Sequence, residues 1–431
     1  MTISELYQLY LQHPSIQTDT RKLQAGDLYF ALKGDRFDGN SFAEQALEAG
    51  AAYAIIDNPS RRINDRTILV DDVLSTLQQL ALHHRRQFNI PVLAITGSNG
   101  KTTTKELIHE VLSTTYRTYT TQGNLNNHIG IPLTLLRIKP DAEMAVVEMG
   151  ANHLKEIEAY CRYTEPTHGL ITNLGKAHLE GFGGVEGVRR GKGELFDYLR
   201  NKGASVFVWW NDEYLREMSK GIPSVVRYGT SEGDIVGQAI TAGVGQQEFL
   251  QVRVTAGADL PEIKTQLVGD YNLPNVLAAV AVGKTFNVPD VAIRKAIEQY
   301  HPENSRSQLI ERDGMQIILD AYNANPSSMR AAIENFSRIQ ADKKILMLGA
   351  MAELGAESLE EHRQILQLIR SHPWEAVVLV GGDFGKINHP YIQFQTSTEA
   401  HDWLAGQNKD ALKNAYILIK GSRSMQMEKV L

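Results

Sequence analysis

The sequence predicts an α/β protein with three domains, and two observations support this class. Short apolar runs alternate with amphipathic helical stretches along the chain, which is typical of helices packed on mainly parallel sheets. The chain has 431 residues, more than the ~150 residues that one hydrophobic core usually organises. We therefore expect a small amino-terminal α/β domain (1–89), a central P-loop-type domain with a mainly parallel sheet and an antiparallel annex (90–303), and a Rossmann-like carboxy-terminal domain (304–431).

Composition and charge exclude several classes of protein. Hydrophobic residues make up 42% and charged residues 22%, which excludes a disordered or disulfide-scaffold chain. The 44 basic and 50 acidic side chains give a net charge of −6, so we expect no nucleic-acid partner. The lone Cys161 fits a reducing compartment, and the longest apolar runs, such as 276–282, are too short to cross a bilayer. We expect a cytoplasmic monomer without membrane insertion.

The amino-terminal domain is predicted from two helices and a strand. An apolar helical face over 42–47 ends at Gly50, and the β-rich run 54–56 follows it. Apolar side chains at helical spacing over 73–81 predict a second helix, and Pro91 disfavours helix just before it. The first domain boundary is therefore placed near residue 89.

The central domain is predicted from a strand that leads through a glycine-rich turn into a helix, the order of a phosphate-binding domain. Two further apolar strands favour a parallel sheet, whereas alternation near residue 250 predicts an antiparallel annex. The expected elements are strands at 92–95, 145–147, 170–172, 250–254 and 263–268, with helices at 102–112 and 274–286.

The carboxy-terminal domain repeats strand and helix in order, which is a doubly wound pattern. Ser358 with Glu361 three residues later predicts a capping box at the start of one helix. The expected elements are strands at 316–319, 345–348, 376–380 and 416–419, with helices at 327–336 and 359–369.

The glycine-rich turn is the strongest chemical motif in the chain. It reads Ile-Thr-Gly-Ser-Asn-Gly-Lys-Thr-Thr-Thr over 95–104, and its glycines let backbone amides turn toward an anion at the start of a helix. Lys101 adds a full positive charge, and the Thr102 hydroxyl can hold magnesium against phosphates. The loop is two residues shorter than the standard P-loop. The alternative is an ordinary glycine turn that caps a helix.

This loop resembles the ATP site of the Mur ligase superfamily, and further stretches share the resemblance from Asp19 to Arg423. They are 121–130 (TQGNLNNHIG), 147–151 (VEMGA), 178–183 (HLEGFG), 320–326 (DAYNANP) and 420–424 (KGSRS). The resemblance implies an ATP-dependent amide ligase of peptidoglycan precursor synthesis. It would join D-alanyl-D-alanine to UDP-N-acetylmuramoyl-tripeptide through an acyl phosphate, using ATP and Mg²⁺ as cofactors.

The resemblance assigns four catalytic residues, and each has a physical rationale. Glu148 ends an apolar strand at the edge where open α/β sheets bind ligands, and His178 follows another strand end. Lys192 aligns with the lysine that the superfamily carries as a carbamate, formed from CO₂, and Arg189 and Arg190 would stabilise that anion. The alternatives are a solvated carboxylate, a loop histidine and a surface lysine. The catalytic set is Lys101, Glu148, His178 and Lys192, and the metal ligands are Thr102, Glu148, His178 and the Lys192 carbamate.

Further residues are assigned to the nucleotide and to the two other substrates. Their bland alternatives are helix caps, turn-forming amides and a loop Arg-Asp pair. The ATP-binding set is Gly97, Ser98, Asn99, Gly100, Lys101, Thr102, Thr103, Asn272, Asn275, Arg306 and Asp320. The substrate-binding set is Thr20, Arg21, Asn124, Asn126, Asn127, Tyr322, Asn323, Asn325, Lys420, Ser422 and Arg423, and the stretches 19–21 and 33–38 match family segments at the UDP end.

Two rival functions stay open at this point. One is a sibling ligase that adds a single amino acid to a muramoyl peptide or a folate, against which stand the 322–326 stretch and the Asn126-Asn127 loop. The other is a P-loop module that binds nucleotide without ligation; a guanine-reading loop is not formed by 201–204, which lacks the aspartate. The chain departs from the family at Ala350, where aspartate is usual, so no contact is assigned there.

Overall fold

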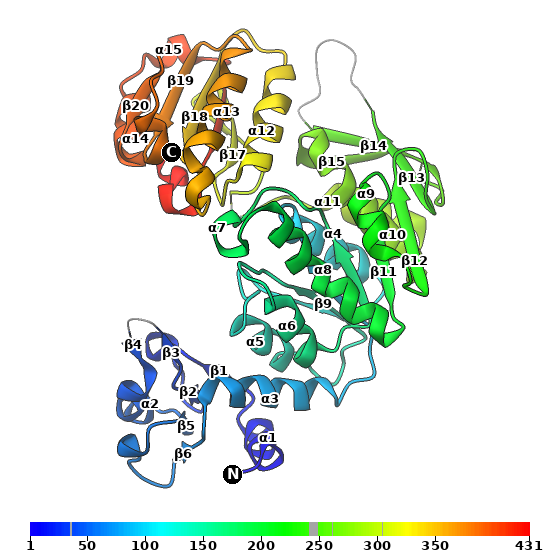
Figure 1. Cartoon of the computed structure of the whole chain (residues 1–431), viewed down its shortest axis with the longest axis vertical. Coiled ribbons are helices and arrows are strands. Elements are labelled where there is room, and N and C mark those ends of the chain that lie inside the picture. Colours follow the sequence, from blue (N-terminus) through cyan, green and yellow to red (C-terminus); the bar gives the residue numbers. More distant parts are fainter. Residues whose placement is uncertain (35–36, 241–248, 261, 304) are drawn as a thin grey trace. The chain divides into compact units, whose positions relative to one another are not determined.

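The computed structural model describes residues 1–34, 37–240, 249–260, 262–303 and 305–431. Helices and strands alternate along the chain (Figure 1), which confirms the α/β class. The described residues form two compact units. Unit 1 comprises Met1–Ala94, Arg117–Gly150 and Glu156–Thr167, and unit 2 comprises Ile95–Tyr116, Ala151–Lys155 and His168–Leu431.

The amino-terminal part of unit 1 is a small parallel sheet in the order β1-β2-β5-β6. Tyr29, Ala46 and Ile56 belong to its buried core, in which α2 packs on β5. The two helices predicted here are α2 and α3, and the predicted strand is β5. The elements are α1 Ile3–Gln12, β1 Ile16–Gln17, η1 Thr20–Lys22, β2 Leu28–Phe30, β3 Lys33–Gly34, β4 Phe37–Asp38, η2 Gly39–Phe42, α2 Ala43–Glu48, β5 Tyr53–Ile56, η3 Pro59–Arg61, β6 Thr67–Leu69 and α3 Val73–Arg85.

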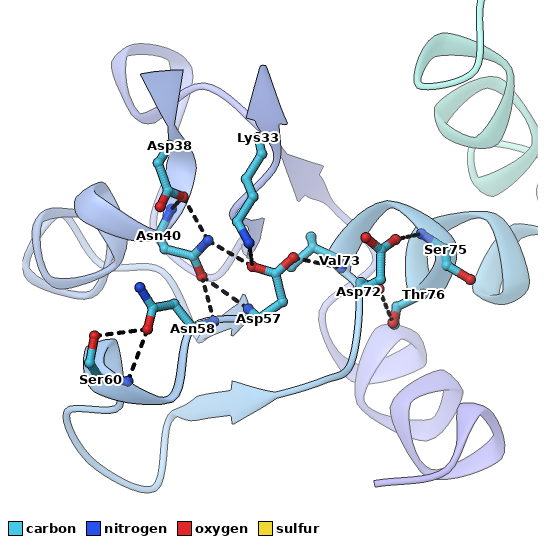
Figure 2. Close-up of polar contacts among 10 residues, drawn as sticks. All are labelled: Lys33, Asp38, Asn40, Asp57, Asn58, Ser60, Asp72, Val73, Ser75 and Thr76. Carbon is cyan, nitrogen blue, oxygen red and sulfur yellow. Dashed lines mark hydrogen bonds and ion pairs between the residues drawn. The ribbon is translucent and has the colours of Figure 1, made fainter. Parts of the chain in front are cut away.

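A polar network ties together the loops at one end of this sheet (Figure 2). The buried Asn40 amide donates to Asp38 Oδ1 (2.7 Å) and Asp57 Oδ1 (2.8 Å), while Asn40 Oδ1 accepts from the Asp57 N–H (3.0 Å). Asp57 also pairs with Lys33 Nζ at 2.8 Å and accepts from the Val73 N–H at the start of α3. Burial raises the pKa of Asp57, but the Lys33, Asn40 and Val73 donors outweigh it and leave the pKa below its usual value.

The remainder of unit 1 continues from α3 into three strands at one end of the nine-stranded sheet. Strands run there in the order β7-β9-β8, and α5 and α6 pack against α3. The buried His84 on α3 bonds the Tyr7 hydroxyl (3.0 Å) through Nδ1 and the Ile138 carbonyl (2.8 Å) through Nε2. The elements are β7 Val92–Thr96, which continues into unit 2, β8 Thr118–Thr120, α5 Gly130–Leu136, β9 Met144–Glu148 and α6 Glu156–Thr164.

Unit 2 begins with the rest of β7 and a sheet in the order β15-β14-β13-β12-β11-β10-β7. Strands β10 to β13 pair in parallel and β13 to β15 pair antiparallel, which confirms the predicted annex. The apolar run 276–282 lies in α10, which is buried along its length and packs against α4. The elements are α4 Lys101–Ser113, β10 His168–Ile171, α7 Leu179–Phe182, α8 Val185–Lys202, β11 Ser205–Trp209, α9 Glu213–Ser219, β12 Ser224–Gly229, β13 Ile235–Ala239, β14 Phe249–Ala256, β15 Ile263–Val268, η4 Asp270–Asn272, α10 Leu273–Thr285 and α11 Asp290–Gln299.

The carboxy-terminal part of unit 2 has its own sheet in the order β16-β17-β21-β18-β19-β20. Only β16 among these strands pairs antiparallel, with β17, so the predicted doubly wound pattern is confirmed for the described residues. The elements are β16 Gln308–Arg312, β17 Met315–Asp320, α12 Pro326–Arg338, β18 Lys344–Gly349, η5 Gly355–Glu357, α13 Ser358–Arg370, β19 Ala376–Val380, η6 Gly382–Lys386, β20 Ile392–Phe394, α14 Ser397–Ala405, α15 Lys409–Leu412, β21 Tyr416–Lys420, η7 Arg423–Met425 and η8 Met427–Val430.

The predicted capping box at Ser358 is wrong. The 3₁₀ turn of η5 runs directly into α13, so Ser358 is already the first helical residue and no side chain caps the helix. Glu361 instead pairs with Lys176 Nζ at 2.5 Å. A local sequence motif cannot specify a cap when the preceding residues are themselves helical. Across the described ranges, no helix has both the length and the apolar character that crossing a bilayer requires.

Candidate functional site

The glycine-rich loop between β7 and α4 is held by residues that follow β10. The Ser98 N–H donates to the Asn173 carbonyl (3.0 Å), and the Asn99 N–H donates to Asn173 Oδ1 (3.0 Å). The Thr172 hydroxyl donates to the Asn99 carbonyl at 2.6 Å. Gly97 has φ +140°, and a Cβ there would lie 2.0 Å from Thr172 Oγ1, so the close approach requires glycine. Thr172 and Asn173 therefore fix the conformation of the loop.

The loop presents a cation and a helix start. Lys101 Nζ donates to the carbonyls of Gly97 (2.7 Å) and Ser98 (3.3 Å), which places the ammonium over the loop. No side chain caps α4, since its N-cap residue is Gly100 with φ +77°. The first N–H groups of a helix attract anions. Thr102 is buried in the first turn, beside the half-buried Thr103, so this end of α4 can take a phosphate group.

The two asparagines expected near adenine lie together at the start of α10. Asn275 Nδ2 donates to Asn272 Oδ1 (2.9 Å), Asn272 Nδ2 donates to the Val268 carbonyl (2.9 Å), and Asn275 Oδ1 accepts from the Thr104 hydroxyl (3.0 Å). Neither side chain caps α10, so the capping alternative does not describe them. The bond between Thr104 and Asn275 joins α4 to α10.

Glu148 is a buried carboxylate of unit 1 with one unpaired oxygen among the described residues. It ends β9 and is 2% exposed; its Oε1 accepts from Asn126 Nδ2 at 2.8 Å. Its Oε2 is buried and has no hydrogen-bond partner among the residues that the structure describes. An unpaired buried carboxylate oxygen is costly unless a ligand satisfies it. This atom therefore fits a Mg²⁺ ligand, because Mg²⁺ prefers carboxylate oxygens.

The asparagine-rich loop before α5 divides its amides between two tasks. Asn126 orients Glu148, whereas Asn127 Oδ1 accepts the N–H groups of Ile129 (3.2 Å) and Gly130 (2.9 Å) and so holds the turn. Asn124 is exposed. The turn-forming alternative thus describes Asn127, whereas Asn126 bonds Glu148.

His178 precedes α7 with φ +52°, a left-handed conformation that residues other than glycine rarely adopt. Its Nδ1 bonds a carboxylate oxygen of Glu353, which also has a positive φ (+61°). That bond holds the pKa of Glu353 below its usual value, against the opposing effect of burial. A carboxylate on one ring nitrogen is the arrangement that orients a metal-binding histidine through the other. Glu353 was missed by the sequence analysis.

Lys192 lies in the middle of α8 and is fully buried. Its Nζ donates to the Ala151 carbonyl at 2.8 Å and lies 4.9 Å from the centre of the Phe182 ring. The surface-lysine alternative is therefore wrong, because a surface residue would keep its ammonium in water.

The carboxy-terminal residues of unit 2 form a charged cluster at the ends of β17 and β21. Asp320 Oδ2 pairs with the buried Lys420 Nζ at 2.5 Å, and Asp320 Oδ1 accepts from the Ser307 N–H at 3.2 Å. The Arg306 guanidinium stacks 3.6 Å from the Tyr322 ring centre, and its Nε is buried without a hydrogen-bond partner in the described part of the chain. Arg306, Asp320, Tyr322 and Lys420 are thus brought together.

The other predicted substrate residues have varied settings. Asn323 is exposed, and Asn325 caps α12 through its Oδ1, which accepts from the Ser328 N–H at 3.0 Å. The Ser422 hydroxyl donates to the Ala350 carbonyl at 2.6 Å, and Arg423 pairs with Glu428. At Ala350, the backbone carbonyl therefore makes the contact with Ser422.

At the amino terminus, Thr20 and Arg21 lie in η1. Arg21 pairs with Asp19 at 2.8 Å and lowers the pKa of that carboxyl to about 2, so the loop Arg-Asp pair is present. Asp35 and Arg36, which belong to the 33–38 stretch assigned to the UDP end, lie outside the described residues.

The described residues contain no group of three or more histidine, cysteine, aspartate or glutamate side chains that could hold a metal ion by itself. The predicted ligand set contains one carboxylate, one imidazole, one hydroxyl and one modified lysine, so it differs in kind from such a cluster. Thr172 and Asn173, which clamp the loop, were missed. Their polarity directly after a buried strand was the sequence feature that could have found them.

Three family models match the chain in succession. They are the Mur ligase family, catalytic domain (residues 14–85), the Mur ligase middle domain (95–283) and the Mur ligase, glutamate ligase domain (305–423). Together they span most of the sequence.

Named relatives and solved structures agree with these models. The chain is 37% identical to the UDP-N-acetylmuramoyl-tripeptide–D-alanyl-D-alanine ligase of Bacillus subtilis, over 96% of this chain and 92% of the relative, and 35% identical to that of Escherichia coli, over 97% and 92%. A crystal structure of MurF from Acinetobacter baumannii superposes with a TM-score of 0.87, at 31% identity and covering 96% of this chain and 92% of that one. MurF ligase from Thermotoga maritima in complex with ADP gives 0.86, at 27% identity and 97% and 96% coverage.

Proposed function

The chain belongs to the Mur ligase family, and we propose that it joins D-alanyl-D-alanine to UDP-N-acetylmuramoyl-tripeptide with conversion of ATP to ADP and phosphate. The observation that carries this proposal is similarity over nearly the whole chain to ligases of that name. The 322–326 stretch and the nucleotide loop belong to the part that matches.

The reaction has two steps. The tripeptide carboxylate attacks the terminal phosphorus of ATP, which forms an acyl phosphate and releases ADP. The free amine of the dipeptide then attacks the acyl carbon, phosphate leaves, and the amine nitrogen loses a proton as the amide forms. Both steps place negative charge on oxygen, so preorganised cations and N–H donors would stabilise them.

The nucleotide loop is suited to the first step. We propose that Gly97 to Thr103 hold the phosphates, with Lys101 turning from the loop carbonyls to the transferred group. The uncapped N-terminus of α4 adds partial positive charge. Asn272 and Asn275 would support the adenine side, and Arg306 and Asp320 would meet the terminal phosphate and the ribose.

We propose Thr102, Glu148, His178 and Lys192 as Mg²⁺ ligands. The unpaired Oε2 of Glu148 and the carboxylate-held imidazole of His178 support this set. When bound, Mg²⁺ neutralises charge that develops on phosphate oxygens. Glu148 and His178 would be held in place for that role by Asn126 and Glu353.

Lys192 is proposed to carry a carbamate, formed when its neutral amine bonds the carbon of CO₂ and releases a proton. The complete burial of Lys192 supports a role inside the protein rather than at its surface. An ordinary lysine, with a pKa of ~10.4, would be protonated at neutral pH and would repel Mg²⁺, whereas a carbamate would bind it. Lys192→Ala should lose most ligation activity, and a small added carboxylate should restore part of it. An alanine variant with full activity would refute the carbamate.

The amine and acceptor ends are assigned from the remaining residues. We propose that Tyr322, Asn323, Asn325, Lys420, Ser422 and Arg423 surround the dipeptide, and that Thr20, Arg21, Asn124, Asn126 and Asn127 contact the UDP-muramoyl acceptor. We also propose the division 1–89, 90–303 and 304–431, which the three matched family segments support. A cytoplasmic location is proposed because ATP and a nucleotide-linked substrate are found there.

Phosphate release by the purified protein tests the function. With ATP, Mg²⁺ and UDP-N-acetylmuramoyl-tripeptide, we expect turnover on adding D-alanyl-D-alanine and none on adding D-alanine, glutamate, lysine or diaminopimelate. Turnover with a single amino acid but not with the dipeptide would identify a sibling ligase. Nucleotide binding without phosphate release under any of these conditions would identify a non-ligating module.

A further inference from the structure

An amide–amide hydrogen bond joins the nucleotide loop to the N-cap residue of α12. Asn325 Nδ2 donates to Asn99 Oδ1 at 2.7 Å, and these residues are 226 positions apart in the sequence. Asn99 is half-buried and Asn325 is buried, so water competes weakly for this bond.

Both partners are fixed independently of the bond they share. The Asn99 backbone is clamped by Thr172 and Asn173, as described above. The Asn325 side chain caps α12 through Oδ1, and its own N–H donates to Ser328 Oγ at 3.1 Å, which completes a capping box. A displacement of the nucleotide loop would therefore displace the start of α12 as well.

A second contact follows the same path. The Lys176 N–H donates to Ser327 Oγ at 3.0 Å. A Cβ on Gly175 would lie 2.9 Å from Ser327 Oγ and 3.2 Å from Asn99 Nδ2, so the loop after β10 meets Asn99 and α12 at one point. Because Asn325 Nδ2 donates to Asn99 and Asn325 Oδ1 accepts from Ser328, the Asn325 side chain would position the segment that surrounds the dipeptide without itself bonding the dipeptide.

We propose that Asn99 and Asn325 are positioning residues that couple nucleotide binding to the placement of the Tyr322–Asn325 segment. This inference rests on the proposed function, in which that segment meets D-alanyl-D-alanine. Phosphates bound by the Gly97–Thr103 loop would fix the orientation of the Asn99 side chain. Asn99 would in turn fix the position of Asn325 at the start of α12. The coupling is reciprocal, so the dipeptide would also favour nucleotide binding.

A double-mutant cycle in the full-length enzyme tests the coupling. Asn99→Ala removes the acceptor, and Asn325→Ser removes the donor while keeping a favoured N-cap residue. At saturating ATP and acceptor, each single variant should raise the KM for D-alanyl-D-alanine by roughly 3- to 10-fold, the effect of one hydrogen bond. The double variant should be no worse than the more impaired single variant, because one bond is lost in all three.

Ser328→Ala is the matched control, since it removes the other half of the capping box and leaves the Asn99–Asn325 bond in place. It should keep the wild-type dipeptide KM. A KM in the control that rises as far as in Asn325→Ser would show a helix-start effect and overturn the proposal, as would additive effects or unchanged KM values in the two singles.

A second readout separates coupling from local damage. In the wild type, a non-hydrolysable ATP analogue should tighten dipeptide binding measured by calorimetry, and that factor should fall toward one in both variants. An unchanged factor would overturn the proposal. A wild-type enzyme that releases no phosphate on addition of the dipeptide would overturn the proposed function, and this inference with it, whereas dipeptide turnover with unaltered variants would overturn this inference alone.

Discussion

Two carboxylates at strand ends are treated in opposite ways by this fold. Glu148, at the end of β9, has one oxygen bonded to Asn126 and the other buried without a partner in the described residues. Asp320, at the end of β17, has both oxygens engaged, by Lys420 and the Ser307 N–H. One carboxylate therefore keeps an oxygen without a hydrogen-bond partner in the described residues, whereas both oxygens of the other are bonded. The proposed role of Glu148 as a Mg²⁺ ligand uses its unpaired oxygen, whereas Asp320, which is proposed to meet the ribose, also holds two strand ends together through Lys420.

Glu148→Gln should produce the largest effect. Glutamine keeps the size of the side chain and can bond Asn126, but it removes the charge that a cation would meet. We expect kcat/KM to fall by about 100-fold or more, the scale of losing one preorganised electrostatic contact. The unfolding midpoint should stay at or above that of the wild type, because an unpaired buried oxygen contributes no stability. Phosphate release and thermal unfolding measure the two quantities, and near wild-type turnover would contradict the assignment.

Asp320→Asn should lower the free energy of unfolding, which Glu148→Gln should not lower. Lys420 is 2% exposed, so removing the aspartate leaves a buried ammonium without its anionic partner. Breaking such a pair costs ~3 kcal/mol of unfolding free energy. Urea unfolding measures this, and Glu148→Gln is the matched control. A change of stability no larger than in that control would show that the pair is not structural.

Removing both members of the pair sharpens the comparison. Asp320→Asn combined with Lys420→Met leaves no buried charge, and replacing a buried ion pair by an uncharged one is often close to neutral. The double variant should therefore unfold at a higher urea concentration than Asp320→Asn alone. An additive loss would mean that Lys420 stabilises the fold through other contacts, such as its 3.3 Å bond to the Asn323 carbonyl.

The features that sequence reasoning found are local ones. The nucleotide loop could be predicted because a strand, two glycines, Lys101 and a helix are adjacent in the chain. Glu148 could be found because it follows an apolar run. The partner of His178 could not, since Glu353 lies 175 positions away and only the folded sheets bring the two together. The capping box at Ser358 failed because the sequence motif does not reveal that the preceding turn is already helical.

His84 is a buried polar side chain, and the smallest effect is expected there. Like Asp320 it has both polar atoms bonded, to Tyr7 and the Ile138 carbonyl, yet burial lowers its pKa below the usual 6.5, with a bond to Ile138 opposing. The unfolded chain therefore takes up a proton at a higher pH than the folded one does. The stability that neutral His84 contributes is complete above pH ~6.5 and is lost as the pH falls through the folded pKa.

His84→Gln should retain a side chain that can bond Tyr7 while removing this titration. Urea unfolding at pH 7.5 and at pH 5.5 should show a smaller loss on acidification in the variant than in the wild type, and equal losses would show that His84 does not titrate on unfolding.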